Sequence, residues 1–152
     1  MTVQPVSQSR IQSAIALASS RTGVDFGYLL GQAKLESGLN ANARAGTSSA
    51  SGLYQFVEQS WLAVLKKHGA EHGMGWAADA IGQSGGRYYV SGGARAAVMG
   101  LRNDPTAASL MAAEHASDNK AALESTLGVM LIDRNAPQLE LSHAEGGGLL
   151  TK

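Results

Sequence analysis

Residues 25–38, DFGYLLGQAKLESG, decide the fold that the sequence predicts. Asp25 is a residue type that caps the first turn of helices, and the segment after it predicts a helix that runs to Glu36. Leu29, Ala33 and Glu36 recur at helical spacing, so they fall on one face of that helix. A charged residue therefore shares the face that two apolar residues mark as buried.

Helical spacing dominates the chain on both sides of this stretch, and no clear alternating strand pattern appears. Asp104-Pro105 is typical of a helix start, with a capping residue followed by proline at the first helical position. Residues 82–93 predict a loop. The other predicted helices end at Gly23, Gly69 and Arg102, and the helix after Pro105 is expected to stop at Gly128. The sequence therefore predicts a single all-α domain.

The composition excludes several classes of partner and site. The chain has 152 residues, 12 basic and 12 acidic side chains and a formal net charge of zero, so its charge does not favour nucleic acid or an acidic membrane surface. Its apolar runs are far shorter than the ~20 residues needed to span a bilayer, and no membrane span is expected. Without cysteine, no disulfide, thiolate metal site or cysteine nucleophile is expected.

Glu36 is the first candidate for a catalytic residue. Apolar neighbours and the carbonyl end of its helix both favour the neutral form of a carboxylic acid. An acid that keeps its proton near neutral pH can act as a general acid. The alternative is a surface glutamate whose helical phase is misjudged by one residue.

Glu114 repeats the same anomaly. It falls on the face of its predicted helix that also carries Leu110 and Met111. The alternative to a functional role is a structural ion pair with an arginine such as Arg95 or Arg102.

His68 and His72 are the only histidines at a spacing that suits a shared metal ion on a helix. Gly69 and Gly73 interrupt any helix there, and the glutamate between the histidines does not have the zincin arrangement. We therefore predict no metal site and no cofactor. The other two histidines are isolated in the sequence.

Two strings, LESGLN at 35–40 and ASGLYQF at 50–56, resemble the signature of the soluble lytic transglycosylase family. That signature is a Glu-Ser pair at a helix end, followed after a loop by Gly-Leu-(Met/Tyr/Phe)-Gln. The resemblance covers about residues 10–128. It implies a lysozyme-like helical domain with a glycan-binding groove, related to goose-type lysozymes.

The resemblance assigns roles to residues of both strings. Glu36 matches the catalytic glutamate, and Ser37 matches a serine whose hydroxyl is expected near the acid or the N-acetyl group of the sugar. The second motif is implied to line the groove, with Gln55 bonding to saccharide and Gly52 permitting close backbone approach. The implied substrate-binding residues are Ser37, Gly52, Leu53, Tyr54 and Gln55.

The sequence departs from the family pattern at two places. The third family motif is usually Ala-Tyr-Asn, and its best match at 112–116 carries Glu114 in the position of the tyrosine. This resembles a proteobacterial subgroup, some of whose members are tied to flagellar or secretion assemblies, which makes such a component a candidate partner. The second departure is the segment 129–152, which does not resemble the aromatic-bearing helix with which relatives usually continue.

We expect a flexible N-terminus at 1–9, the lysozyme-like domain at 10–128 and an atypical C-terminal segment or tail at 129–152.

The activity implied by the resemblance is cleavage of the β-1,4 bond between N-acetylmuramic acid and N-acetylglucosamine in peptidoglycan. A lytic transglycosylase would use Glu36 as acid and base and release 1,6-anhydro products. Two alternatives remain open: a muramidase that hydrolyses the bond with Glu36 and Glu114, and a non-catalytic peptidoglycan-binding adaptor. A wall substrate implies the periplasm, although the polar start of the chain lacks the features of a signal peptide.

Overall fold

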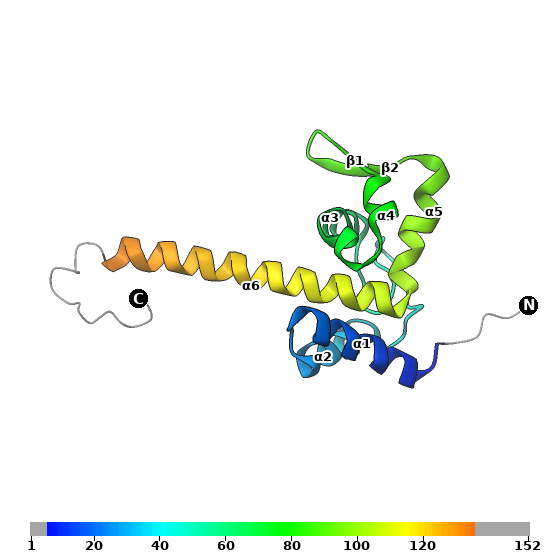
Figure 1. The fold of residues 1–152 in the computed structure, drawn as a ribbon, viewed down its shortest axis with the longest axis horizontal. Helices are drawn as coiled ribbons and strands as arrows, with labels where there is room; N and C mark the ends of the chain where they lie inside the picture. The colour runs from blue at the N-terminus through cyan, green and yellow to red at the C-terminus, as the bar shows by residue number, and fades with distance from the viewer. Residues whose placement is uncertain (1–5, 136–152) are drawn as a thin grey trace, which may run out of the picture. The chain divides into compact units, whose positions relative to one another are not determined.

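The computed structural model describes residues 6–135, with side chains through residue 128, and this part of the chain is mostly helical (Figure 1). The chain divides into two compact units, Met1–Ala116 and Ser117–Lys152, and all predicted site residues lie in the first. The elements in chain order are α1 Gln8–Thr22, α2 Phe26–Ser37, α3 Glu58–His68, η1 Gly69–His72, α4 Gly75–Asp79, β1 Ile81–Ser84, β2 Arg87–Val90, α5 Gly92–Gly100, η2 Leu101–Asn103 and α6 Pro105–Asn135.

The predicted helix boundaries are confirmed where a capping residue sets them. The Asp25 carboxylate accepts a hydrogen bond from the backbone N–H of Tyr28 at 2.9 Å and starts α2. Asp104 starts α6 in the same way, through the backbone N–H of Ala107 at 2.8 Å. Gly23 ends α1 with a φ of 82°, a backbone conformation that glycine adopts without steric cost.

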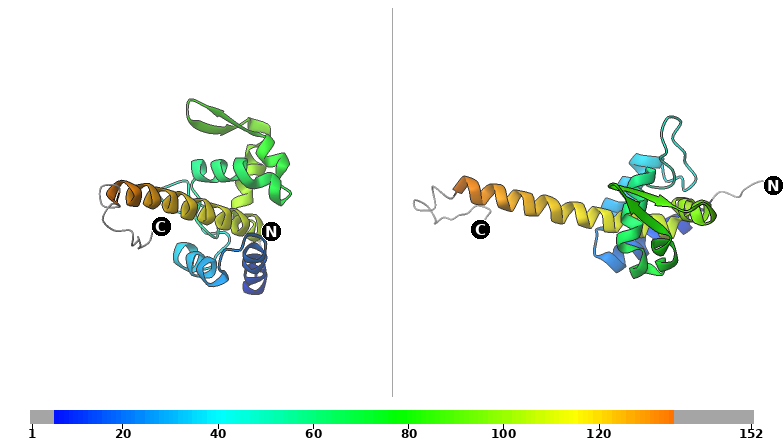
Figure 2. Two further views of the ribbon diagram at one scale, coloured as in Figure 1. Left: turned by 60° about the vertical axis from the view of Figure 1, so that its left-hand side comes forward. Right: turned by 90° about the horizontal axis from the view of Figure 1, so that it is seen from above.

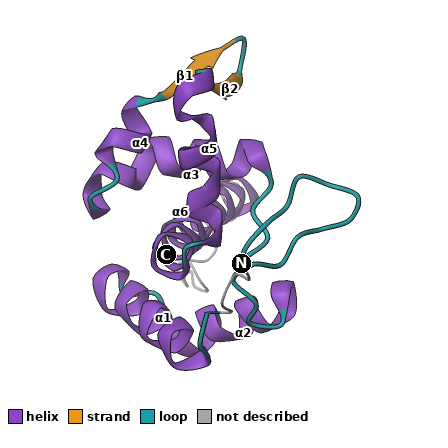
Figure 3. Cartoon of the chain, turned by 90° about the vertical axis from the view of Figure 1, so that its right-hand side faces the viewer, coloured by secondary structure: helices purple, strands orange, loops and turns teal. Residues whose placement is uncertain are grey.

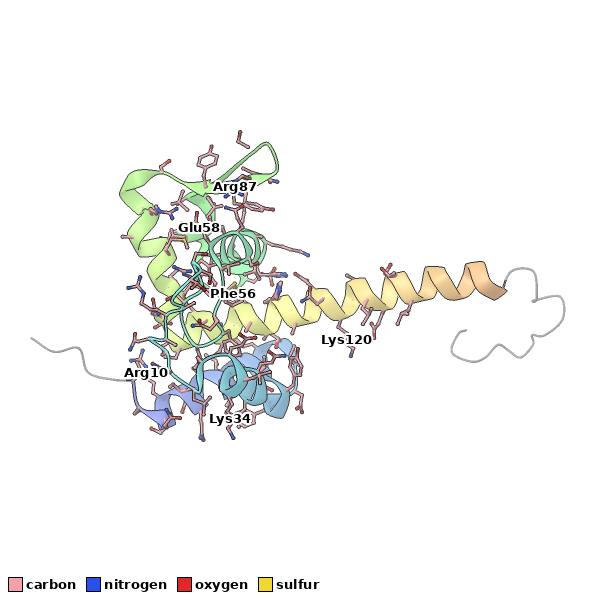
Figure 4. All side chains as sticks on the ribbon, turned by 180° about the vertical axis from the view of Figure 1, so that it is seen from behind. Arg10, Lys34, Phe56, Glu58, Arg87 and Lys120 are labelled. Carbon is pink, nitrogen blue, oxygen red and sulfur yellow. The ribbon has the colours of Figure 1, made fainter. Side chains whose placement is uncertain are left out.

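Within the first unit, the early turns of α6 lie between α1 and α2 on one side and α3, α4 and α5 on the other (Figure 3). Small side chains on these turns, such as Ala108 and Ala113, are fully buried and allow the neighbouring helices to approach closely. Trp61 of α3 is also fully buried and donates its indole N–H to the Val98 carbonyl of α5 at 3.0 Å. Phe56, labelled in Figure 4, packs against Trp61 with ring centroids 5.1 Å apart.

The predicted loop at 82–93 is wrong in part, because it contains most of a β-hairpin (Figure 2). Strands β1 and β2 pair antiparallel, with Ser84 opposite Arg87 at the turn end. Gly85 and Gly86 form the turn with φ values of 56° and 81°. Two consecutive left-handed residues match the right-handed twist of paired strands, so the diglycine closes the hairpin. The fold is therefore mainly helical with one small sheet.

The predicted end of the last helix at Gly128 is also wrong, since α6 continues to Asn135. A glycine inside a helix costs only about 1 kcal/mol relative to alanine, and continuous helix on both sides tolerates it. Of the two predicted terminal segments, residues 1–5 and 136–152 lie outside the described residues, and α1 already begins at Gln8. No helix of the described part is long and apolar enough to cross a membrane.

Candidate active site

Glu36 is the next-to-last residue of α2, and its side chain is exposed. The expectation that it lies on the buried face is wrong. Leu29 and Ala33 are buried as predicted, but the core covers only the earlier turns of that face and not its last turn. Among residues 6–128, no hydrogen bond or ion pair engages the Glu36 carboxylate. This carboxylate is therefore accessible to a ligand.

Ser37 links the end of α2 to the second motif. Its hydroxyl lies 2.7 Å from the Leu53 carbonyl oxygen and 3.1 Å from the Ala33 carbonyl oxygen, and it accepts the backbone N–H of Asn40 at 3.2 Å. The single hydroxyl proton is shared between the two main-chain oxygens, so this serine connects the end of α2 to the second motif. The structure thus joins the end of α2, the helix that carries Glu36, to the turn at 52–55 through Ser37 and Leu53.

Gly52 and Gln55 hold that turn in shape. Gly52 has a φ of 90°, and a Cβ atom there would collide with the Arg102 carbonyl oxygen, so the close approach that it permits is to the protein's own backbone. Gln55 has a φ of 54° and donates its side-chain amide to the carbonyl oxygens of Ala43 at 3.0 Å and Gly52 at 2.8 Å. Its Oε1 has no hydrogen bond among the described residues and can accept one from a donor group of a ligand.

Leu53 and Tyr54, the middle residues of the motif, belong to the core. Leu53 is fully buried, and Tyr54 is half-buried with its hydroxyl donating to the Leu29 carbonyl of α2 at 2.9 Å. Burial raises the pKa of the Tyr54 phenol above its usual value, so the phenol stays neutral and keeps its donor proton. The motif therefore fixes the position of α2 as well as the turn.

Replacing Tyr54 with phenylalanine removes this hydrogen bond and the interaction of the phenol with the Ser109 side chain. We expect the free energy of unfolding to fall by about 1 kcal/mol, the usual net contribution of such a bond. Urea denaturation followed by circular dichroism would measure the change. Tyr89→Phe is the matched control, because the exposed Tyr89 hydroxyl has no hydrogen bond among the described residues. Equal midpoints for the two variants would contradict the structural role of Tyr54.

Glu114 lies on α6 with its side chain mostly buried, and two histidines bind its carboxylate. His72 Nε2 is 2.7 Å from Oε2, and His68 Nδ1 is 3.5 Å from Oε1. Both oxygens of the carboxylate are therefore in contact with imidazole nitrogens. No hydrogen bond or ion pair joins Glu114 to Glu36, both of which are described.

The arginines expected as partners of Glu114 bind elsewhere, so that alternative is wrong. Arg95 Nη2 lies 2.6 Å from Glu58 Oε1, and this pair lowers the pKa of the Glu58 carboxyl. Arg102 donates to main-chain carbonyl oxygens, including that of Phe56 at 3.0 Å. Periodicity showed that Glu114 faces inward, but not which of several distant segments meets it.

No protein-family model and no curated protein matches the chain.

Proposed function

We propose that this protein is a lytic transglycosylase with a lysozyme-like fold that cleaves the glycan strands of peptidoglycan, with Glu36 as its acid and base. The observation that carries the proposal is the exposed Glu36 carboxylate, which has no side-chain partner among residues 6–128 and sits beside the 52–55 turn. The two motifs are adjacent in space although a loop separates them in sequence.

The chemistry needs one carboxylic acid. Protonated Glu36 donates its proton to the bridging oxygen as the bond from that oxygen to C1 of N-acetylmuramic acid breaks. The 6-hydroxyl of the same sugar then forms a bond to C1, and its proton passes to the Glu36 carboxylate. The products are a 1,6-anhydro sugar end and a free 4-hydroxyl, and the glutamate is again protonated. Because the nucleophile belongs to the substrate, no second carboxylate is needed and no water is consumed.

The surroundings of Glu36 support this division of work. Ser37 and Tyr54 hold the acid-bearing helix against the turn, while Gln55 Oε1 offers an acceptor for a sugar hydroxyl. Glu114 is bonded to His72 and His68, which argues against a role as the second carboxylate of a muramidase. A wall substrate makes the periplasm the proposed place of action.

The test is digestion of purified peptidoglycan followed by mass spectrometry of the released muropeptides. We expect ends that carry 1,6-anhydro-N-acetylmuramic acid. Reducing ends instead would replace the proposal with a muramidase. Binding to the wall without any release of fragments would replace it with a non-catalytic adaptor.

A further inference from the structure

A second group of titratable side chains lies where the end of α3 and η1 meet α6. His68, Glu71 and His72 come from five consecutive residues, and Glu114 comes from α6. His68 Nδ1 is 3.2 Å from Glu71 Oε2 and 3.5 Å from Glu114 Oε1. The side chains of His72, His68 and Glu114 are 6%, 11% and 14% exposed, and that of Glu71 is 57% exposed. The group is thus mostly buried and opens to solvent at one ligand.

The local backbone explains why these residues converge. The sequence argument against a metal site was that glycines interrupt a helix between the histidines. The segment Gly69–His72 instead forms a 3₁₀ turn directly after α3. In a 3₁₀ turn, residues three apart are eclipsed, so Glu71 returns to the side of His68. The interruption therefore brings the donors together.

The donor atoms are spaced as ligands of one ion would be. His68 Nδ1 and one carboxylate oxygen each from Glu71 and Glu114 all lie within 4.8 Å of one another. Two ligands on a tetrahedral zinc ion are about 3.4 Å apart when each bond is about 2.1 Å long. The two distances from His68 Nδ1 agree with that separation. Small rotations of the Glu71 and Glu114 side chains would bring all three ligand atoms to this separation.

Electrostatics also favours a cation at this point. Glu71 and Glu114 direct two carboxylates at one largely buried imidazole nitrogen. Buried charges are costly unless opposite charge compensates them. A divalent ion bound by a neutral imidazole and two carboxylates balances the charge of the group.

His72 lies beside the three donors and contacts Glu114. Its Nε2 lies 2.7 Å from Glu114 Oε2, the oxygen that does not face His68, and such a contact orients a ligating carboxylate. Its Nδ1 is buried and has no hydrogen-bond partner among the described residues. Buried polar atoms are nearly always bonded, so the described residues leave the His72 ring incompletely satisfied.

We propose that His68 Nδ1, Glu71 Oε2 and Glu114 Oε1 bind a divalent transition-metal ion, with His72 orienting Glu114. One imidazole and two carboxylates suit zinc, with water as the fourth ligand, better than the all-oxygen sites that magnesium and calcium prefer. The ion would tie η1 to α6 and stabilise the fold. This site is independent of peptidoglycan cleavage and is not used in the mechanism above.

Zinc binding by the full chain, after treatment with EDTA and dialysis, tests the site. We expect calorimetric titration with zinc chloride to give one ion per chain with micromolar or tighter affinity, undiminished by millimolar magnesium or calcium. Cobalt bound in its place should show the visible absorption of a tetrahedral ion. Zinc at about one hundred times its dissociation constant should raise the Tm by about 5–10 °C. Absence of zinc binding would overturn the proposal.

Variants locate the ion. Glu71→Gln alters an exposed side chain, so the fold is retained, and zinc affinity should fall by more than about tenfold; His68→Gln should do the same. The control is the double variant His115→Ala and His143→Ala, which removes both other histidines and should bind zinc like the original chain. Loss of binding in the control, with unchanged binding in Glu71→Gln, would assign the zinc to those other histidines and overturn the proposal.

Discussion

Glu36→Gln is expected to lower the rate of 1,6-anhydro product formation by about 10²–10⁴-fold, the usual contribution of a general acid and base. The amide has the shape of the glutamate but cannot donate the proton that the leaving oxygen needs. Because the side chain is exposed and unbonded among residues 6–128, the substitution should leave the free energy of unfolding within about 0.5 kcal/mol of its original value. Muropeptide release, quantified over time by mass spectrometry, measures the rate.

Glu124→Gln is the matched control, since Glu124 is also an exposed glutamate on a helix. It should digest peptidoglycan at the original rate. Co-sedimentation with insoluble peptidoglycan should show that Glu36→Gln still binds the wall. An undiminished rate of product formation by Glu36→Gln would exclude Glu36 as the acid.

Gly52→Ala should lower the free energy of unfolding by about 3 kcal/mol. Two costs add here: an alanine strained at a φ of 90°, and a Cβ atom that must displace the Arg102 carbonyl. The turn would have to move away from η2, and Leu53 would move with it out of the core. Urea denaturation followed by the fluorescence of the buried Trp61 is the measurement.

Gly46→Ala provides the comparison, because Gly46 has open space around its Cβ position and no left-handed φ. Its effect should stay within about 0.5 kcal/mol. We also expect Gly52→Ala to slow peptidoglycan cleavage, because the turn positions the end of α2 through Ser37. A Gly52→Ala protein as stable as Gly46→Ala would show that the close contact with Arg102 is absent in solution.

The parts of the fold that the sequence predicted correctly are those that depend on near neighbours. Asp25 and Asp104 cap helices through backbone groups three residues away, and Gly23 closes α1 by its own conformation. Such signals require no knowledge of the rest of the chain. The contact between the end of α2 and the 52–55 turn, made by Ser37 and Leu53, depends on the fold and not on near neighbours in the sequence.

The predictions that failed concern contacts between distant segments. The exposure of Glu36 depends on how far the core extends along α2, and the spacing of apolar residues in the sequence does not give that extent. The partners of Glu114 are His72 and His68, which precede it by 42 and 46 positions in the sequence. On charge alone, an arginine was an equally reasonable partner. Glu71 was missed as a neighbour of His68 because Gly69 and Gly73 predicted an interrupted helix there, whereas Gly69–His72 continues directly from α3 as a 3₁₀ turn.

The bond between Ser37 and Leu53 has a consequence for the loop between the two motifs. The loop is closed at its base by the backbone hydrogen bonds from Gly52 to Ala43 and from Ala45 to Ala50. The position of the end of α2 relative to the turn is therefore set by this bond and not by the number of residues in the loop. Since doubling the length of a flexible loop costs only about 0.6 kcal/mol, residues can be inserted at the tip, 46–48, without moving Glu36 away from the turn.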